Sequence, residues 1–581
     1  MRDGSSPADN IETVAPTGPP GRRKWPAGYS LLLLTLGTLV CLLPFSGKAF
    51  HMDDPLFVWT AQHISEHPLD PYGFTVVWYA TRTPVADISK NPPLAAYYAA
   101  LAGILFGWSE RALHMAFLLP ALAVVLGTYV LARRSTGIPL LAATATLLTP
   151  AFLVSSTTLM CDVLMLALWM FAVIFWLAGS DAGRHWQLLA AALLIAACAL
   201  TKYFGVALIP LLLVYSLLKK SRISAWAYLG VPVLVLALYQ NWTHGLYGRG
   251  LLADAVEYAS FHNRGHDLAP LAKALVGSAF TGGSAVPALF FAPWLWKRRW
   301  IFVALAVCAA AGLAIAGHQG WFRTPQATAR WSWISVQMAV LVAGGLSVLG
   351  LAGAGIARKI DAEGLLLSLW VAGTFFFAAF VNWTVNARSV LPMIPAVAIL
   401  ISRRLEAVGL DQAVRFPLKL AAPLLAAGAL SVWVASADTK LANAGRAAAD
   451  RVFAELGPSE VPVYFQGHWG FQYYMQALGA KPADVRNSRF RLGETMVIPE
   501  NTTNSFGPPP GFTLAGRIMT IDLGGSLATM SQPMGAGFYA SVWGPLPFTV
   551  GKVPPERYLI AQLAPTALQN SSAASTRGPG D

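Results

Sequence analysis

The chain has 581 residues, of which 55% are hydrophobic and 12% are charged, and its mean hydropathy is +0.53. This composition is typical of an integral membrane protein and argues against a soluble enzyme. The formal net charge of +13 does not indicate nucleic-acid binding, because the basic residues fall in short clusters between apolar runs, as they do in cytoplasmic loops.

The N-terminal segment, residues 1–27, is rich in Pro, Gly and Ser and is expected to be disordered and cytoplasmic. Arg22, Arg23 and Lys24 then precede an apolar run at 29–46, which fits either a signal peptide or a first membrane helix. We favour the membrane helix, because the run approaches the ~20 residues that a bilayer requires and "SGKAF" is a poor cleavage site.

The first outer loop, residues 47–111, places two adjacent carboxylates directly after this helix. Asp53 and Asp54 are followed by Pro55, and we expect an extended loop in which adjacent side chains point opposite ways. Carboxylates at the level of the lipid headgroups are commonly just solvated, and that remains the alternative to a functional role.

Two apolar runs follow, at 92–108 and 112–132, and by the positive-inside rule only one of them crosses the membrane, because Arg133 and Arg134 would otherwise lie outside. The first run is shorter and begins with two prolines. We therefore predict that it lies at the outer interface and that the second run crosses.

The remaining predicted spans complete a membrane domain over residues 28–436, with about thirteen spans in total and a cytoplasmic N-terminus. They are expected at about 138–157, 162–179, 186–201, 203–218, 225–242, 270–295, 300–317, 333–356, 364–382, 388–402 and 416–436.

Beyond the last span the character of the sequence changes. Strand-like "VPVYFQ" (461–466), helix-like "FQYYMQAL" (471–478) and strand-like "RIMTIDLG" (517–524) alternate with Gly and Pro turns. This pattern predicts a small outer α/β domain over residues 437–565, followed by a disordered tail at 566–581.

Ionisable residues also occur inside or at the rim of the apolar runs. Asp162 opens a span, Lys202 lies between two runs, and Arg388 directly precedes another span. Such groups are costly in a membrane and usually face a cavity, so we expect them to face a site on the outer side. The alternatives are a snorkelling lysine for Lys202 and a plain interfacial anchor for Arg388.

In their order and spacing these motifs resemble the polytopic GT-C glycosyltransferases, in particular bacterial aminoarabinose transferases of lipid A and, more distantly, protein O-mannosyltransferases. The resemblance rests on Asp162 and on the stretches "DD" (53–54), "KNPPLAAYY" (90–98), "LFGWSERALH" (105–114), "LTKYFG" (200–205) and "ARSVLPMIP" (387–395). It implies a helical polytopic fold of GT-C type in a bacterial inner membrane, with the small C-terminal α/β domain in the periplasm.

The resemblance further implies a sugar donor linked to a polyprenyl phosphate. The departing phosphate calls for fixed cations, which Lys202, Arg388 and Lys90 are expected to supply. In the related branch an acid and a lysine precede the two prolines, whereas this chain has Lys90 and Asn91, so that Lys90 is displaced by one residue.

The acceptor hydroxyl, on a lipid, a glycan or a protein, needs a base. We assign this role to Asp53, with Asp54 or Asp162 orienting it, and direct displacement would then invert the anomeric carbon. Which of Asp53 and Asp54 is the base stays open at this stage.

The expected partners are therefore the lipid-linked sugar, its acceptor and membrane lipids, with no nucleic acid. No cofactor is firmly implied, since the four cysteines have no CxxC spacing. A divalent metal ion bound by His51 and the acidic pair remains an alternative, although such neighbours on a short loop are more often hydrogen-bonded.

Two other functions fit parts of this pattern. A transporter or flippase of lipid-linked sugars would share the many spans and the outer cations, but inverted repeats and ionisable groups near the midplane are not evident in the sequence. A binding or scaffold protein would leave the charges within the apolar runs unexplained.

Overall fold

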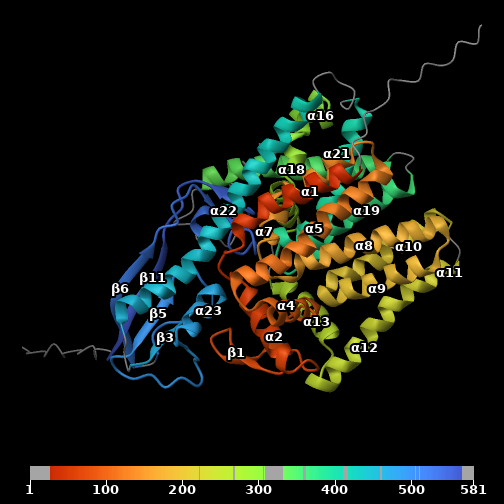
Figure 1. Cartoon of the computed structure of the whole chain (residues 1–581). Helices are drawn as coiled ribbons and strands as arrows, with labels where there is room; N and C mark the ends of the chain where they lie inside the picture. Colours follow the sequence, from red (N-terminus) through yellow and green to blue (C-terminus); the bar gives the residue numbers. More distant parts are fainter. Residues whose placement is uncertain are drawn as a thin grey trace, which may run out of the picture.

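The computed structural model describes residues 27–220, 223–265, 269–304, 306–307, 331–357, 361–409, 416–457, 461–503, 505–509 and 511–565. Within these ranges the chain forms a bundle of helices with a smaller strand-containing domain at one side, and helix α22 runs from one to the other (Figure 1). The predicted polytopic helical fold with a C-terminal α/β domain is confirmed. The predicted N-terminal and C-terminal disordered segments and most of the predicted span at 300–317 lie outside the described residues.

Many of the helices are apolar enough to lie in a membrane. Of the described residues, six segments are also long enough to cross it: Ala27–Phe45 (α1, Ala27–Leu42, with η1, Leu43–Phe45), α5 (Glu110–Ser135), α8 (Cys161–Ala182), α18 (Trp331–Ala357), Ala362–Val381 (α19, Ala362–Phe376, with η5, Phe377–Val381) and Lys419–Leu456 of α22 (Phe416–Leu456). Shorter apolar segments are α4 (Leu94–Phe106), α9 (His185–Thr201), and η2 (Tyr203–Ala207) with α10 (Leu208–Leu218). The total of about thirteen spans stays a prediction.

The other helices connect or cover these segments. They are α2 (Asp54–Glu66), α3 (Val85–Ile88), α6 (Pro139–Leu147), α7 (Pro150–Ser155), α11 (Ile223–Trp226), α12 (Gly230–Tyr247), α13 (Leu251–Gly265), α14 (Pro270–Ser284), α15 (Pro287–Phe290), α16 (Ala292–Leu295), α20 (Ala387–Val390), α21 (Ile394–Ala407) and α23 (Trp469–Ala477), with short η3 (Ala227–Leu229), η6 (Leu391–Met393) and η8 (Gln532–Met534). In the first outer loop, β1 (Thr75–Val77) pairs with β2 (Arg82–Pro84).

Helix α4 is too short to cross a bilayer on its own. Its 13 residues span about 20 Å, against about 30 Å for the hydrocarbon core. The helix ends at Gly107, whose φ of +90° is accessible to glycine. Ser109 then caps the N-terminus of α5 by accepting a hydrogen bond from the Ala112 N–H. These lengths agree with an interfacial α4 and a crossing α5.

The span predicted at 138–157 is interrupted in the structure by two residues between α6 and α7. Pro150 disfavours a helical conformation for Thr149, which is extended (φ −117°, ψ 143°) and caps α7 with its hydroxyl. The chain then passes through a buried turn, residues 156–160, before α8 begins. This turn lies next to the first outer loop.

The core of the bundle is one continuous apolar cluster built mainly by α5, α8, α14, α18 and α21. Trp169 of α8 stacks on Phe204 with ring centroids 5.5 Å apart. Helices α14 and α18 approach so closely that a Cβ atom on Gly282 would collide with the Leu341 carbonyl. Small residues at such a crossing let the two backbones pack directly, as is common in membranes.

The C-terminal domain is built on a five-stranded mixed sheet. Its strand order is β4-β3-β5-β11-β6, in which β3 runs parallel to β4 and β5, and β11 runs antiparallel to β5 and β6. The strands are β3 (Val463–Phe465), β4 (Lys481–Pro482), β5 (Thr495–Pro499), β6 (Phe512–Ile521) and β11 (Glu556–Pro565). The last turns of α22 pack with α23 against the buried side chains of this sheet. The strand-like and helix-like stretches predicted from the sequence correspond to β3, α23 and β6.

Helix α22 extends further than the sequence suggested. Its 41 residues span about 60 Å, twice the hydrocarbon thickness. The helix therefore passes without interruption through the boundary predicted between residues 436 and 437.

Between β6 and β11 the chain turns back to the bundle. Short strands β7 (Leu527–Ala528) and β10 (Thr549–Val550) pair with each other, as do β8 (Met530–Ser531) and β9 (Ala536–Gly537). Aromatic residues of this segment, among them Phe538, Tyr539 and Trp543, belong to the core cluster of the bundle. The C-terminal domain is thus anchored through α22 and through this segment.

Candidate functional site

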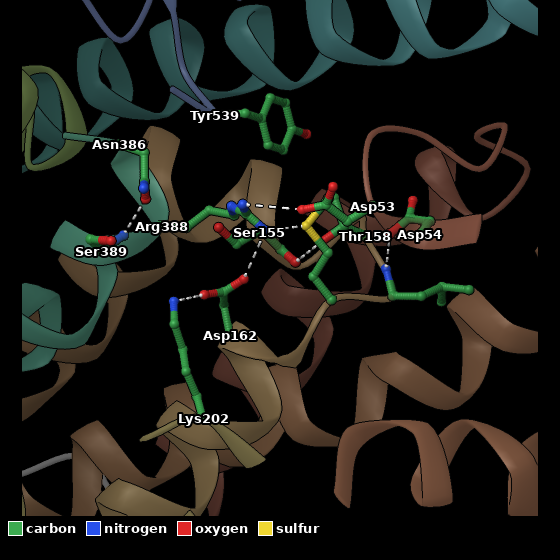
Figure 2. A network of polar contacts seen from close by, with 12 residues as sticks. Asp53, Asp54, Ser155, Thr158, Asp162, Lys202, Asn386, Arg388, Ser389 and Tyr539 are labelled. Carbon is green, nitrogen blue, oxygen red and sulfur yellow. Dashed lines mark hydrogen bonds and ion pairs between the residues drawn. The ribbon is translucent and has the colours of Figure 1, made fainter. Parts of the chain in front are cut away.

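Four of the six residues predicted for the site form a continuous chain of charges. Lys202 Nζ lies 2.5 Å from Asp162 Oδ1, Arg388 Nη1 lies 3.6 Å from Asp162 Oδ2, and Arg388 Nη2 lies 3.5 Å from Asp53 Oδ2. Figure 2 shows this chain running from Lys202 to Asp53. Residues from four separate segments are therefore brought together as two cations alternating with two carboxylates.

Asp162 lies in the first turn of α8 and its side chain is 1% exposed. Lys202 lies at the corner between α9 and η2, so the antiparallel pair of α8 and α9 brings the two together. An isolated buried carboxylate would be strongly unfavourable, and the two cations compensate its charge. Because it is covered on all sides, Asp162 is placed to orient Lys202 and Arg388 rather than to contact a substrate.

Arg388 is held by the short helix α20. Asn386 caps this helix by accepting a hydrogen bond from the Ser389 N–H at 2.7 Å. Asn382 Nδ2 donates to the Ser389 hydroxyl at 2.8 Å. The guanidinium also contacts the Met160 sulfur in the turn before α8. These contacts fix the direction in which the arginine leaves the backbone.

Asp53 and Asp54 have different surroundings, although they are adjacent. Asp53 precedes α2 and its side chain is 39% exposed, whereas Asp54 is the first residue of α2 and is fully buried. Asp54 accepts hydrogen bonds from the His51 N–H at 2.9 Å and from the Leu159 N–H at 2.8 Å. Burial raises the pKa of Asp54 to about 7, although the nearby Lys48 ammonium acts in the opposite direction. Asp53 is thus available to a ligand, while Asp54 fastens the first outer loop to the turn before α8.

The extended loop expected at this position is wrong. Asp53 has a helical backbone (φ −81°, ψ −1°), and Met52 before it has a positive φ of 50°. A positive φ is uncommon for a side chain of this size. The chain turns sharply here because the helix starts at Asp54, and this turn, rather than alternation along an extended strand, directs the two carboxylates apart.

A cavity of about 590 Å³ lies beside the charged chain. All three residues predicted to bind the donor phosphate, Lys90, Lys202 and Arg388, line it. The rest of the wall is mostly apolar and aromatic and comes from α13, from η2 and from the segment around η5. η5 is a π-helical turn, a local irregularity that is frequent at functional sites. The structure therefore gathers the predicted cations around one space.

Lys90, in the wall of this cavity, forms an ion pair with helix α13. Its ammonium lies 2.5 Å from Asp254 of α13 and 5.3 Å from the centre of the Tyr258 ring. Burial and the neighbouring Asp53 carboxylate raise the pKa of Tyr258. Asp53 itself does not line the cavity and adjoins it through Arg388, 3.5 Å away.

A second cavity, of about 660 Å³, lies between α4 and α5. Its wall includes strongly exposed apolar side chains such as Leu101, Phe106 and Leu119, with Arg111 as its charged residue. None of the predicted site residues lines it. The cavity that holds the three cations is therefore the candidate site.

The structure adds residues that the sequence-based reasoning missed. Tyr539 of the C-terminal domain covers the Arg388 guanidinium, with its ring centre 5.5 Å away (Figure 2). Lys48 and Asp438 form a fully buried ion pair at 2.6 Å behind it. Both are ionisable residues at the end of, or within, an apolar run, so the rule that singled out Asp162 applies to them as well. The sequence around Tyr539 carries no comparable signal.

A metal site at His51 has no support in the described part of the chain. There, no three His, Cys, Asp or Glu side chains are grouped so that they could hold a metal ion. The His51 ring is buried and packs edge-on against Tyr539 at 5.5 Å. Burial lowers the pKa of His51 to about 4, so the ring is neutral at physiological pH.

Comparison with known sequences relates part of the chain to a family. Residues 90–243 match the family described as dolichyl-phosphate-mannose-protein mannosyltransferase. This range includes Lys90, Asp162 and Lys202. No curated protein sequence matches the chain significantly.

Among solved structures, the chain is similar to ArnT from Cupriavidus metallidurans bound to undecaprenyl phosphate, with 15% identity, a TM-score of 0.46 and coverage of 81% of this chain and 93% of that one. The apo form of ArnT from the same organism gives 14% identity, a TM-score of 0.39 and coverage of 92% and 98%. An oligosaccharyltransferase from Archaeoglobus fulgidus, tethered to an acceptor peptide, gives 14% identity, a TM-score of 0.47 and coverage of 78% and 63%. These identities and scores are low, so the sequence family match carries the relationship.

Proposed function

We propose that this chain is a GT-C glycosyltransferase that transfers a sugar from a polyprenyl-phosphate donor to an acceptor hydroxyl at the outer face of a bacterial inner membrane, and the family match over residues 90–243 supports this proposal. The observation that carries the proposal is that Lys90, Lys202 and Arg388 line one cavity whose remaining wall is mostly apolar. Such a cavity suits an amphiphile with an anionic head, because cations bind the phosphate by charge-assisted hydrogen bonds and the apolar wall receives the prenyl chain.

The cations act on the leaving group. When the bond between the anomeric carbon and the phosphate oxygen breaks, negative charge grows on the phosphate, and fixed cations stabilise it. Asp162 holds Lys202 at 2.5 Å and Arg388 at 3.6 Å, so both are oriented before the donor binds. Lys90 joins them when the phosphate replaces Asp254 as its partner.

Asp53 is the base in this scheme. Its partly exposed carboxylate takes the proton of the acceptor hydroxyl while the hydroxyl oxygen attacks the anomeric carbon. The new bond forms on the face opposite the departing polyprenyl phosphate, so the configuration of the anomeric carbon is inverted. Arg388, 3.5 Å from Asp53, keeps the carboxylate close to the site of charge development.

The acceptor is a lipid, a glycan or a protein hydroxyl, and the C-terminal domain over residues 437–565 shapes its access. The charged residues of the scheme all belong to the membrane domain. The C-terminal domain expressed without that domain is therefore expected to transfer no sugar.

The test is sugar transfer by the purified full-length protein in lipid nanodiscs. Mass spectrometry of the lipids that copurify with it identifies the donor, and radiolabelled sugar from that donor is then offered with extracts of envelope lipids, glycans and proteins. Comparing these fractions from cells with and without the gene identifies the acceptor. Movement of the donor across vesicle membranes without its consumption would instead indicate a flippase and refute the proposal.

A further inference from the structure

The C-terminal domain is hydrogen-bonded to the segment that carries Arg388. Residues 538–541, which we call the clamp segment, run alongside residues 384–387, and four of the hydrogen bonds between them involve backbone groups. The bonds are Ala387 N–H to the Phe538 carbonyl (3.0 Å), Ser541 N–H to the Val385 carbonyl (2.8 Å), Ser541 N–H to the Thr384 hydroxyl (3.0 Å) and Val385 N–H to the Ser541 hydroxyl (3.2 Å). The backbone directly before the arginine is thus set by a segment far away in the sequence.

Within the clamp segment, Tyr539 contacts the arginine itself. The aromatic ring is 6% exposed, and its centre lies 5.5 Å from the Arg388 guanidinium carbon. Its hydroxyl donates a hydrogen bond to Asp438 Oδ2 at 2.8 Å. Arg388 is therefore held by Asp53 and Asp162 through its charge and by the Tyr539 ring through a cation–π contact.

The anchor of Tyr539 is a buried ion pair. Asp438 of α22 and Lys48, shortly before Asp53 in the chain, lie 2.6 Å apart and are both fully buried. Thr529 donates a further hydrogen bond to Asp438 at 3.0 Å, and Lys48 donates one to Thr157 at 3.3 Å. A buried ion pair contributes little net stability, because removing the two charges from water costs about as much as their attraction provides. Its best-documented role is to specify one arrangement of the surrounding elements.

We propose that Tyr539 is a positioning residue of the donor-phosphate site, which holds Arg388 in place and couples it, through Asp438 and Lys48, to the loop that carries Asp53. The inference rests on the proposed function, because it concerns the phosphate of the donor. It assigns the C-terminal domain a second role besides acceptor access: this domain does not line the cavity itself but packs on Arg388, which does.

The contact geometry explains why the ring is needed. Arg388 has carboxylates on two sides, and the ring limits how its guanidinium can turn between them. The main effect of losing the ring should therefore be weaker binding of the donor phosphate. Loss of the hydroxyl alone leaves the ring over the guanidinium and should weaken binding less.

The experiment measures the affinity of the purified full-length protein in nanodiscs for undecaprenyl phosphate, together with its thermal unfolding. Tyr539→Leu should weaken binding by about 2- to 30-fold, the range expected for a cation–π contact. Tyr539→Phe should remain closer to wild type. Tyr464→Leu is the matched control, because Tyr464 belongs to the same domain, is 9% exposed and packs on Phe490 away from the site. It should lower thermal stability without changing the affinity.

A double-mutant cycle separates positioning from general stability. In an Arg388→Gln background, Tyr539→Leu should cause little further loss of affinity, since the group that it positions is already gone. Fully additive losses, or equal effects of Tyr539→Leu and Tyr464→Leu, would overturn the inference. A wild-type protein that binds undecaprenyl phosphate but transfers no sugar would refute the proposed function. The double-mutant cycle would then still test whether Tyr539 positions Arg388. A wild-type protein that does not bind it would refute both.

Discussion

Replacing Asp53 by asparagine separates the two roles that the structure allows for its carboxylate. The ion pair with Arg388 is 3.5 Å long and the Asp53 side chain is 39% exposed, so solvent screens it. Such a pair contributes about 1 kcal/mol at most, or about fivefold in donor affinity. A general base, in contrast, contributes about 10²- to 10⁴-fold to the rate, which equals about 2.7 to 5.4 kcal/mol of barrier. Asp53→Asn should therefore lower kcat at least about 100-fold and leave the donor Kd within about fivefold.

Asp54→Asn is the control, because the neighbouring carboxylate has a different environment. Asp54 is fully buried and accepts two backbone N–H groups with its two oxygens. An asparagine offers one acceptor oxygen and one amide nitrogen that cannot accept, so one buried N–H loses its partner at a cost of about 1 to 3 kcal/mol. We expect a lower Tm and a smaller loss of turnover than for Asp53→Asn.

The assay measures initial rates at saturating donor and acceptor, with thermal unfolding of the same samples. A rate for folded Asp53→Asn within about tenfold of wild type is below the range of general-base catalysis and would exclude Asp53 from that role. Abolished transfer in a stably folded Asp54→Asn protein, with Asp53→Asn active, would move the base to Asp54. If neither change affected transfer, the chemical scheme itself would be refuted.

Three further predictions concern the cations, the topology and the C-terminal domain. Lys202→Ala should weaken donor binding and lower turnover together, because it removes a cation from the leaving phosphate, and an unchanged donor Kd would contradict the assigned site. In a cysteine-free background, a cysteine at Glu257 should react with an impermeant maleimide from outside and one at Ala182 should not; the opposite labelling would overturn the predicted topology. Burial raises the pKa of Glu556 from 4.5 to about 7, so the stability that its neutral form provides is complete below pH 4.5 and is lost as the pH rises through about 7. The wild-type Tm should accordingly fall between about pH 4.5 and pH 7 more than that of Glu556→Gln, and parallel curves would refute this reasoning.

The charged residues of the site could be predicted because each of them interrupts an apolar run. Asp162, Lys202 and Arg388 stand out in this way, and the cost of charge in a membrane suggests that such residues face a cavity. Their grouping is what the structure adds. Lys90 is displaced by one residue from the family pattern, which left its role open. Its position in the same cavity as Lys202 and Arg388 supports a role in phosphate binding, although its partner in the structure is Asp254.

The remaining parts of the site depend on contacts between distant segments. Lys48 and Asp438 are 390 positions apart, and no periodicity in either segment indicates that they pair. Tyr539 lies in a segment of short strands and turns whose packing on the bundle depends on the path of α22. An apolar run predicts that a helix forms, but it does not predict where that helix ends inside the protein. For this reason neither the length of α22 nor the interruption before α7 was predicted.

The turn that follows α7 is itself connected to the site. Helix α7 begins at Pro150 and ends at Ser155, and the turn at 156–160, between the spans predicted at 138–157 and 162–179, is non-helical and entirely buried. Non-helical backbone at membrane depth is tolerated where protein covers it or where it lines a cavity, because its polar groups need partners. This turn supplies such partners in both directions: the Leu159 N–H bonds to Asp54, and the Met160 sulfur contacts Arg388. The turn between the two predicted spans is therefore the place where the loop with Asp53, the cation site and the bundle are joined.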